Sequence, residues 1–447
     1  MITVKLKKGL DIPLQGEAAR ETMGVSRPDV FAVVPDHFAG ITPRLSVHEG
    51  DRVKAGTPLF HDKVHEQMQF VSPVSGVVEA INRGERRKVM SITIKADLED
   101  TFEVFDTKSI SDGKQVKQLL LQSGLWMFVK QRPYDVIANP DLQPKAIFIS
   151  GFDSAPLAPD YNYVLQGQAS ALQAAVDAFA KIAKVHIGLS VRQPNNTLSN
   201  LKNVEFTAFD GPHPAGNVGV QINHVDPVNK GEVVWTINVQ DLALIGHFLL
   251  SGKVELTKLV ALTGPMVIGP KYYRYRYGAP LSQIVRGTVH KEVALRIVSG
   301  NVLSGHQIGM DEPLEPTANQ ISVIAEGSET HEFMGWIMPR FNIFSTNRTV
   351  ASAFLCGKKD FDFDARMLGG RRAIIVSGEY DKVLPMDIYP EYLLKAMIAG
   401  NLDRMEQLGA YEIAPEDMAL CEYVCTSKLP VQSIVRQALD NMRKELE

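Results

Sequence analysis

Residues 45–79 contain Leu45-Ser-Val-His-Glu-Gly-Asp-Arg-Val-Lys-Ala-Gly-Thr-Pro-Leu-Phe60, then His61-Asp-Lys-Val-His65, and later Phe70-Val-Ser-Pro-Val-Ser-Gly-Val-Val-Glu79. Valine and leucine recur there between polar residues, which is typical of short strands. Gly50, Gly56 and Gly76 stand at the corners, where glycine accepts the sharp turns between strands. The stretch therefore predicts two short strands around a hairpin, and the rest of the first domain is predicted around them.

This hairpin resembles the barrel-sandwich hybrid of biotinyl and lipoyl carrier domains, in which V-x-x-G-D-x-V-x-x-G-x-x-L precedes S-P-x-x-G. In such carriers the modified lysine stands at the hairpin tip, and Asp62-Lys63 imitates the Asp-Lys pair of lipoyl domains. Lys63 nevertheless lies ten residues before Pro73, which makes the hairpin longer than a carrier's symmetric tip. We expect Lys63 to be an ordinary turn residue. The alternative is a lipoyl or biotinyl carrier domain fused to an unrelated α/β enzyme.

The composition is that of a globular protein with several domains. The 447 residues carry a net charge of −4, whereas nucleic-acid-binding proteins usually show a basic excess. Three cysteines are too few for a disulfide scaffold, which favours a reducing compartment. The N-terminus lacks the apolar segment of a signal peptide, and His247 interrupts the longest apolar run. We expect a soluble chain, or one peripheral to a membrane partner, with no nucleic acid bound.

Strand and helix patterns alternate after residue 100. An amphipathic helix pattern at 168–184 lies among buried-strand patterns, and this alternation predicts a parallel sheet with covering helices. The strand patterns are at residues 146–150, 185–190 and 204–208.

Strand patterns return after Leu259, where a strand, a short helix and a returning strand favour a small β-grasp domain. Residues 330–380 are irregular, with Ala373–Ser377 as the clearest strand pattern. Helical patterns then fill the chain from Pro390 to its end.

The loop Phe209-Asp-Gly-Pro-His-Pro-Ala-Gly-Asn-Val-Gly219 is the most unusual in the chain. Gly211, Gly216 and Gly219 permit another group to approach the backbone closely, and His213 stands between two prolines. The loop is either a ligand or partner surface or a rigid connection to the next element.

Tyr273, Tyr275 and Tyr277 share one face of a predicted strand, with Arg274 and Arg276 on the other. Interleaved aromatic and basic residues are found in proteins that bind single-stranded nucleic acid. Because no wider basic field surrounds them, we favour an interdomain or intersubunit contact.

The usual fingerprints of nucleotide and metal sites are missing. G-x-G-x-x-G is absent, and residues 246–254 imitate a P-loop but are one residue too long and lack its Ser or Thr. His61 and His65 have the spacing of a helical zinc motif but fall in the predicted hairpin. Cys421 and Cys425 share a helix face, yet three cysteines cannot supply a four-cysteine cluster. No catalytic constellation, metal site or cofactor site is indicated.

Six motifs spread over the whole chain carry a second resemblance. They are Lys8-Gly-Leu-Asp-Ile-Pro13, Ser72-Pro-Val-Ser-Gly76 with Ile81-Asn-Arg-Gly84, Gly211-Pro-His-Pro-Ala-Gly216, Arg296-Ile-Val-Ser-Gly300, Leu384-Pro-Met-Asp-Ile388 and Ala419-Leu-Cys-Glu-Tyr-Val-Cys425. Together they resemble the A subunit of the sodium-translocating NADH:quinone reductase, a family related to the C subunit of the Rnf complex and to the flavin subunit of respiratory complex I.

The resemblance implies a multidomain α+β fold with four domains. They are an unmodified barrel-sandwich hybrid at 1–100, a Rossmann-like α/β domain at 101–257, a β-grasp domain of the SLBB kind at 258–330, and a mainly helical domain with a degenerate iron–sulfur motif at 331–447. Flavin-binding relatives carry a glycine-rich loop in the second domain and four cysteines in the last. This chain has neither, so it is expected to bind no cofactor itself.

The family works as a six-subunit membrane complex that uses NADH, flavins, iron–sulfur centres and quinone to pump sodium. The resemblance implies a peripheral subunit on the cytoplasmic side of the bacterial inner membrane, docked on the other subunits and especially on the membrane B subunit. It would contribute to reduction of ubiquinone or menaquinone without being catalytic alone. The candidate quinone or partner surface comprises Gly211, His213, Gly216 and Gly219, followed by Tyr273, Tyr275 and Tyr277. An independent NADH:flavin dehydrogenase, which would be yellow with FMN, is a third hypothesis.

Overall fold

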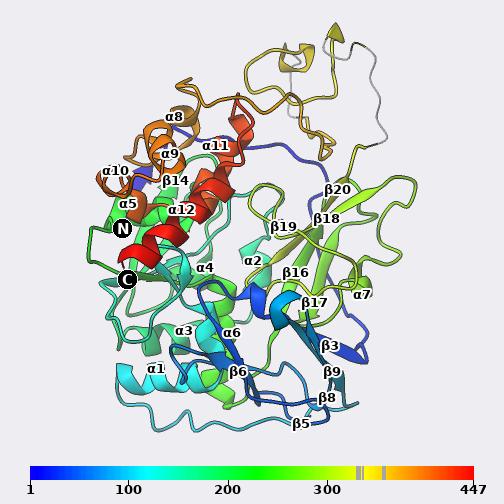
Figure 1. The fold of residues 1–447 in the computed structure, drawn as a ribbon, viewed down its shortest axis with the longest axis vertical. Coiled ribbons are helices and arrows are strands. Elements are labelled where there is room, and N and C mark those ends of the chain that lie inside the picture. The colour runs from blue at the N-terminus through cyan, green and yellow to red at the C-terminus, as the bar shows by residue number, and fades with distance from the viewer. Residues whose placement is uncertain (329–333, 335–336, 355–358, 447) are drawn as a thin grey trace.

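The computed structural model describes residues 1–328, 334, 337–354 and 359–446. Its strands form four sheets, of seven, six, four and three strands, and its last helices gather beside the largest sheet (Figure 1). The chain is therefore a multidomain α+β protein, as the sequence predicted.

Two small sheets make the N-terminal domain, which lies at the lower end of the molecule in Figure 1. Phe60 and Phe70 face each other across the pair β6–β7 and stack with their ring centroids 4.7 Å apart in the domain core. Lys63 is exposed in the loop that joins these two strands, so the predicted hairpin is confirmed. The sheets have the orders β3-β9-β8-β5 and β4-β6-β7, from β3 (Val30–Val33), β4 (Pro43–Leu45), β5 (Arg52–Val53), β6 (Pro58–Asp62), β7 (Gln69–Val71), β8 (Gly76–Arg83) and β9 (Val89–Ala96), with the short helices η1 (Pro35–His37) and η2 (Glu85–Arg87).

The seven-stranded sheet forms the α/β domain and has the order β1-β14-β13-β12-β15-β10-β11. Its five strands from β1 to β15 run parallel, while β10 and β11 are antiparallel additions at the other edge. The strands are β1 (Ile2–Lys5), β10 (Lys130–Arg132), β11 (Val136–Ile137), β12 (Ala146–Ser150), β13 (Lys184–Ser190), β14 (Glu205–Asp210) and β15 (Val234–Thr236).

Helices cover both faces of this sheet. Ile147 and Ile149 of β12 share a core with α3 and α6, whereas Ala146 and Phe148 pack with Ile222 of α5 on the opposite face. The predicted parallel sheet with covering helices is thus confirmed. The helices of this domain are α1 (Gly113–Gln122), α2 (Tyr161–Val164), α3 (Ala169–Phe179), α4 (Asn196–Ser199), α5 (Val218–Val225), α6 (Val239–Ser251) and η3 (Leu125–Phe128).

The six-stranded sheet, of order β19-β18-β20-β16-β17-β2, contains the predicted β-grasp region. Residues 266–269 form only an isolated bridge, from Val267 to Val289, and follow the turn at Gly264 and Pro265. The elements are β16 (Thr257–Thr263), β17 (Lys271–Arg276), α7 (Ser282–Val285), β18 (Leu295–Ser299), β19 (His306–Gln307), β20 (Gln320–Ala325) and β2 (Ala19–Met23).

The first 25 residues cross the molecule instead of joining the N-terminal domain. β1 pairs in parallel with the edge strand β14, and β2 pairs with the edge strand β17. Each strand covers an edge that would otherwise expose unpaired backbone groups. The division into domains at residues 100, 257 and 330 stays a prediction. In the structure, the N-terminal segment gives one strand to the seven-stranded sheet and one to the six-stranded sheet.

The C-terminal helices pack on the α/β domain, sharing a core with Leu6, Phe209 and Val220. Residues 373–377 run without helix or strand, so the predicted strand there is wrong, because no strand among the described residues pairs with them. The helices are η5 (Ala351–Phe354), α8 (Tyr380–Val383), α9 (Pro390–Ile398), α10 (Leu402–Gln407), η6 (Ala410–Glu412), η7 (Pro415–Met418), α11 (Ala419–Val424) and α12 (Val431–Leu446).

Within the described part of the chain, none of the helices combines the length and the apolar character that crossing a bilayer requires.

Candidate functional site

The candidate site lies at the carboxyl ends of β12 and β15. The chain continues from β12 to β13 on one side and later returns to β15 on the other side of β12. The strand order therefore reverses between β12 and β15, and a crevice lies beyond their carboxyl ends, although the helices that follow the two strands, α3 and α6, pack on the same face of the sheet. Ligands of open α/β sheets bind at this kind of switch point.

A cavity of about 220 Å³ occupies the crevice. It is smaller than the roughly 300–1,000 Å³ typical of pockets for drug-sized ligands. Three parts of the chain enclose it: the α/β domain, the β-grasp region and the C-terminal helices. Polar side chains on its wall include Lys130, Asp153, Tyr161, His213, Asn238, Asn301, Ser304 and Glu416.

Ser154 joins the unusual loop to the connection that follows β12. The Ser154 hydroxyl accepts a hydrogen bond from the Gly216 N–H at 2.8 Å and lies 3.0 Å from Nδ1 of His213. The His213 N–H donates to a carboxylate oxygen of Asp11 at 2.7 Å. His213 is buried, and this burial lowers its pKa to about 4. The imidazole is therefore neutral at pH 7 and faces the cavity as part of a rigid wall.

The three glycines of this loop approach protein groups. A Cβ on Gly211 would lie 2.6 Å from Cβ of Leu6, and one on Gly216 would lie 2.6 Å from the Ser154 nitrogen. A Cβ on Gly219 would overlap the Asp417 carboxylate. Of the two predicted roles, the rigid connection therefore accounts for the glycines, while His213 and Gly216 also line the cavity.

Two carboxylic acids at the cavity are pushed toward their neutral form. Burial raises the pKa of Asp153, although the Ala155 N–H donates to its carboxylate at 2.8 Å. Burial also raises the pKa of Asp241, whose carboxylate lies 3.2 Å from Nζ of Lys258. The wall therefore carries two acids whose charged form is disfavoured by burial, together with Lys130, whose pKa is raised by the neighbouring Asp135.

Tyr161 presents a hydroxyl to the same cavity. The side-chain amides of Asn238 and Asn319 each donate to the Tyr161 oxygen at 3.3 Å. Because the Tyr161 oxygen accepts both of these hydrogen bonds, its O–H can donate a hydrogen bond to an acceptor in the cavity.

A buried ion network fastens the C-terminal helices beside this site. Arg132 at the end of β10 donates to Asp417 at 2.9 Å and to Glu416 at 2.8 Å. The side chains of Arg132 and Asp417 are 1% and 0% exposed. Because Glu416 also lines the cavity, the network sets the position of that wall.

The tyrosines of β17 point into the core. Tyr273, Tyr275 and Tyr277 are all buried, and Arg274 is exposed. The Tyr275 hydroxyl donates to the Ala279 carbonyl at 2.6 Å, and the Tyr277 ring lies 6.4 Å from that of Phe38 in the N-terminal domain. These rings offer no exposed surface for stacking, and Tyr277 makes an interdomain contact of the kind that the sequence favoured.

The other residues singled out in the sequence lie apart from the cavity lining. His65 is 3.2 Å from Asp62, and His61 is 3.1 Å from Ser46. Cys421 and Cys425 are buried, and the Tyr380 hydroxyl donates to Sγ of Cys425 at 2.9 Å. Cys356 falls outside the described residues. In the parts of the chain that are described, no three metal-ligating side chains are placed to hold an ion.

Sequence reasoning missed most of the cavity wall. Asp153 and Asn238 each follow a parallel strand within three residues, and this position was an available signal. No sequence pattern indicates that Glu416 belongs to the site, because only the packing of the C-terminal helices on the α/β domain brings it there.

These features define a class of protein: a chain that joins a barrel-sandwich hybrid, an α/β domain with a switch-point crevice and a β-grasp domain. Residues 4–97 match the model of the NqrA N-terminal barrel-sandwich hybrid domain, residues 111–254 that of the NqrA second alpha/beta domain, and residues 259–309 that of the NQRA C-terminal domain. The chain belongs to the NqrA family.

Curated relatives are named as the A subunit of the Na(+)-translocating NADH-quinone reductase. Those of Pasteurella multocida and Haemophilus influenzae are 37% identical to this chain, and that of Glaesserella parasuis is 38% identical, with all of each chain covered. A solved NAD+-reducing [NiFe]-hydrogenase overlays on 74% of this chain and 61% of its own at 13% identity and a TM-score of 0.38, which is too low to establish a common fold. The family favours the predicted role in a complex over the carrier alternative.

We expect the replacement His213→Gln to flatten the dependence of stability on pH. His213 has a pKa near 4 when folded and about 6.5 when unfolded, so the unfolded chain binds its proton first as the pH falls. The free energy of unfolding should therefore fall by up to about 3 kcal/mol as the pH drops from 6.5 toward 4. Urea unfolding of both proteins from pH 7.5 to 4.5 measures the difference. His48→Gln, on an exposed turn, is the control, and an unchanged pH slope in His213→Gln would contradict the assignment.

Proposed function

We propose that this chain is a peripheral subunit of a Na+-translocating NADH-quinone reductase, that it docks on the membrane subunits from the cytoplasmic side, and that its switch-point cavity receives the quinone ring. The observation that carries the proposal is the cavity itself. It stands where α/β proteins bind ligands, and hydrogen-bond donors, among them the Tyr161 hydroxyl and the Lys130 ammonium, face it.

A quinone ring suits the groups on this wall. Its two carbonyl oxygens are acceptors, and the Tyr161 hydroxyl and the Lys130 ammonium are donors on the cavity wall, where burial also raises the pKa of Asp153. Reduction of a quinone consumes two electrons and two protons. The electrons would come from cofactor-bearing subunits, and Asp153, with its raised pKa, is suited to supply a proton.

The residues present do not fit a flavin nucleotide or NADH. A phosphate cradle needs a glycine-rich turn into a helix N-terminus, whereas Gly151 is followed by Pro156 and Pro159. A Cβ on Gly151 would lie 2.8 Å from the Gly188 carbonyl and 2.8 Å from Leu198, so this glycine serves strand packing.

Nor do the C-terminal thiols fit an iron–sulfur cluster. Such clusters normally take four cysteine ligands, and this sequence has three cysteines. Cys421 and Cys425 lie in the apolar core of the helices, where burial raises the pKa of the Cys421 thiol. We therefore propose that the chain keeps the scaffold of its flavin-binding relatives without their cofactors.

Photolabelling of the assembled complex with an azido-quinone tests the cavity. We expect label on this chain near Tyr161 or His213, and a roughly 5- to 10-fold lower yield in Tyr161→Phe, because loss of one hydrogen bond costs about 1 kcal/mol. Tyr275→Phe is the matched control, since its hydroxyl bonds inside the β-grasp core, and it should label within about 2-fold of the original chain. Label confined to other subunits would refute the quinone site while leaving the docking role.

A further inference from the structure

The run Arg371–Val376 has the sequence of a strand, but no strand in the described part of the chain pairs with it. Residues 371–377 contain no helix, turn or bend. The run is held at both ends: the Arg372 N–H donates to the Ser427 carbonyl at 2.9 Å, and the Ser377 N–H donates to Glu391 at 2.9 Å. Its position is therefore defined without sheet pairing.

The backbone in the middle of this run is open. Among the described residues, no hydrogen bond is made by the backbone groups of Ile374, Ile375 or Val376. Ile374 packs against the core of the C-terminal helices, while Ile375 and Val376 are 59% and 51% exposed. Three consecutive β-branched residues favour a strand, and an open strand backbone is a template for pairing with another chain.

The surroundings of the run are apolar and basic. Met367 and Leu368 are both more than half exposed, and Arg371 and Arg372 are exposed at its start. The run Arg371–Val376 itself carries two positive charges and no carboxylate, whereas the whole chain has a net charge of −4. An occupant that complements this surface is apolar and carries carboxylates.

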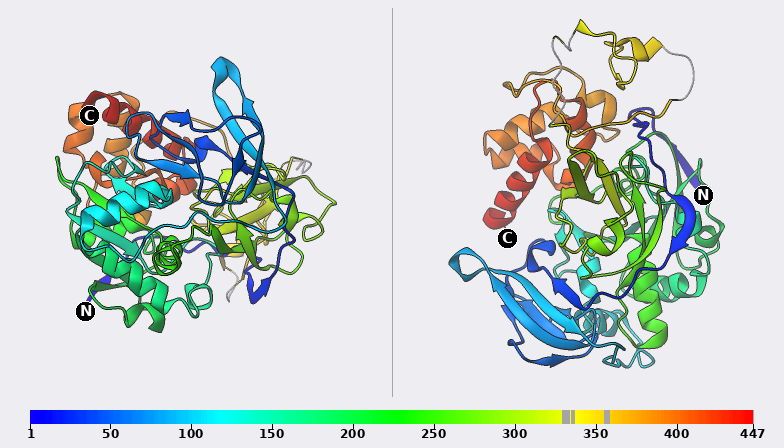
Figure 2. Two further views of the ribbon diagram at one scale, coloured as in Figure 1. Left: turned by 90° about the horizontal axis from the view of Figure 1, so that it is seen from below. Right: turned by 90° about the vertical axis from the view of Figure 1, so that its right-hand side faces the viewer.

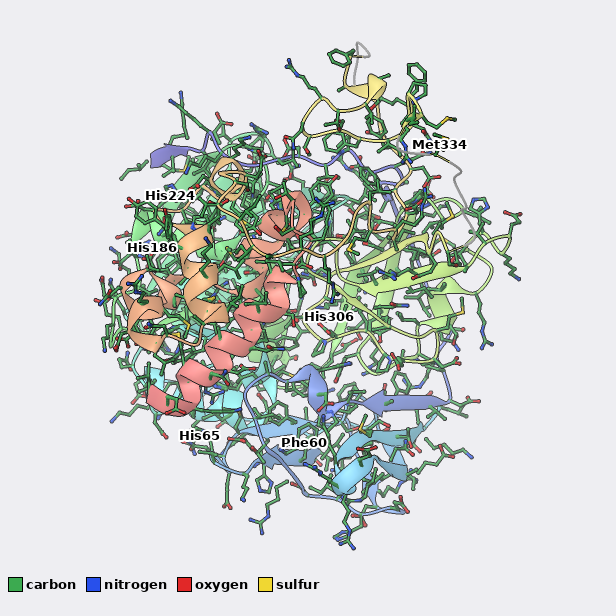
Figure 3. All side chains as sticks on the ribbon, turned by 45° about the horizontal axis from the view of Figure 1, so that its top comes forward. Phe60, His65, His186, His224, His306 and Met334 are labelled. Carbon is green, nitrogen blue, oxygen red and sulfur yellow. The ribbon has the colours of Figure 1, made fainter. Side chains whose placement is uncertain are left out.

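The surface lies at the end of the molecule opposite the N-terminal domain. Residues 337–354 project at that end in Figure 1 and in the right-hand view of Figure 2, and Met334 in Figure 3 lies far from Phe60 and His65. A partner could therefore reach it without touching the cavity.

We propose that Arg371–Val376 accepts an extended segment of another subunit of the complex, which pairs with it as an added β-strand and presents apolar side chains with Asp or Glu. The inference rests on the proposed docking role. A strand is favoured over a lipid surface because a bilayer cannot satisfy the open N–H and carbonyl groups of this run.

Hydrogen–deuterium exchange on the whole complex, purified through this chain, tests the pairing. We expect the amides of Ile374, Ile375 and Val376 to exchange at least about 10-fold more slowly in the complex than in the isolated chain, because pairing removes them from solvent. Equal exchange in the two states would overturn the inference while leaving the docking role. Failure of the chain to copurify with any membrane subunit would overturn both.

Two variants distinguish a specific effect of the run Arg371–Val376 from the effect of adding charge anywhere on the helical region. Ile375→Asp/Val376→Asp should lower retention on washed membranes at least about 10-fold, since it places two like charges against a carboxylate-bearing partner. Ile398→Asp is the matched control, because Ile398 is also 51% exposed and lies on α9 of the same helical region. Equal retention of both variants would overturn the proposal. Protection of the same amides by vesicles of phosphatidylglycerol alone would overturn it in favour of a lipid surface.

Discussion

Replacing Arg132 with methionine is expected to lower the free energy of unfolding by about 3–5 kcal/mol, because the change leaves a buried carboxylate without its cation. Asp417 is fully buried and receives the Arg132 guanidinium at 2.9 Å. Its remaining hydrogen bond comes from the Ala414 N–H at 2.9 Å, which cannot balance a full charge. Urea unfolding measures the loss.

Two comparisons isolate the buried pair. Arg20→Met breaks an ion pair with Asp160 in which the arginine is 71% exposed, and it should cost only about 0–1 kcal/mol. The double variant Arg132→Met/Asp417→Asn removes both charges and should recover most of the stability. A loss below about 1 kcal/mol in Arg132→Met would show that the network does not hold the C-terminal helices in place.

Gly246→Ala is expected to lower the free energy of unfolding by about 2–3 kcal/mol. Gly246 lies in the middle of α6, where a Cβ would overlap the backbone carbonyl of Ala171 on α3. The gain of about 1 kcal/mol from replacing a helical glycine is too small to offset the separation of two packed helices. Thermal or urea unfolding measures the effect.

Gly24→Ala is the control, because a Cβ there would meet nothing within 4 Å and should change stability by less than about 0.5 kcal/mol. The Gly246 result also bears on the site, since α6 begins directly after Asn238 at the cavity. If Gly246→Ala is as stable as the original chain, α3 and α6 are not packed as closely as the structure shows.

Several elements could be predicted from local pattern alone. The hairpin around Lys63, the strand β12 and the helix α3 all follow from apolar periodicity and from glycines at the turns. Residues 246–254 do not have the spacing of a P-loop. In the structure Gly246 instead allows α6 to pack closely against Ala171 of α3.

The remaining predictions depended on partners distant in sequence. β1 pairs with β14 about 200 residues away, and no local pattern indicates which sheet an edge strand will join. The tyrosine face of β17 was predicted as a contact surface, but its burial follows from packing against other segments. The wrong strand prediction at 373–377 has the same cause, because the strand propensity of a segment does not tell whether another strand lies beside it.

By itself the sequence determined the α+β class, the barrel-sandwich hairpin, the family and the failure of the nucleotide fingerprints, because each depends on residue type at short spacing. Only the tertiary structure decided that the glycines of 211–219 pack against Leu6, Ser154 and Asp417, and that the cavity combines residues from three parts of the chain. The physical reason is that burial, which shifts the pKa of His213 and Asp153, arises from groups that are far apart along the chain.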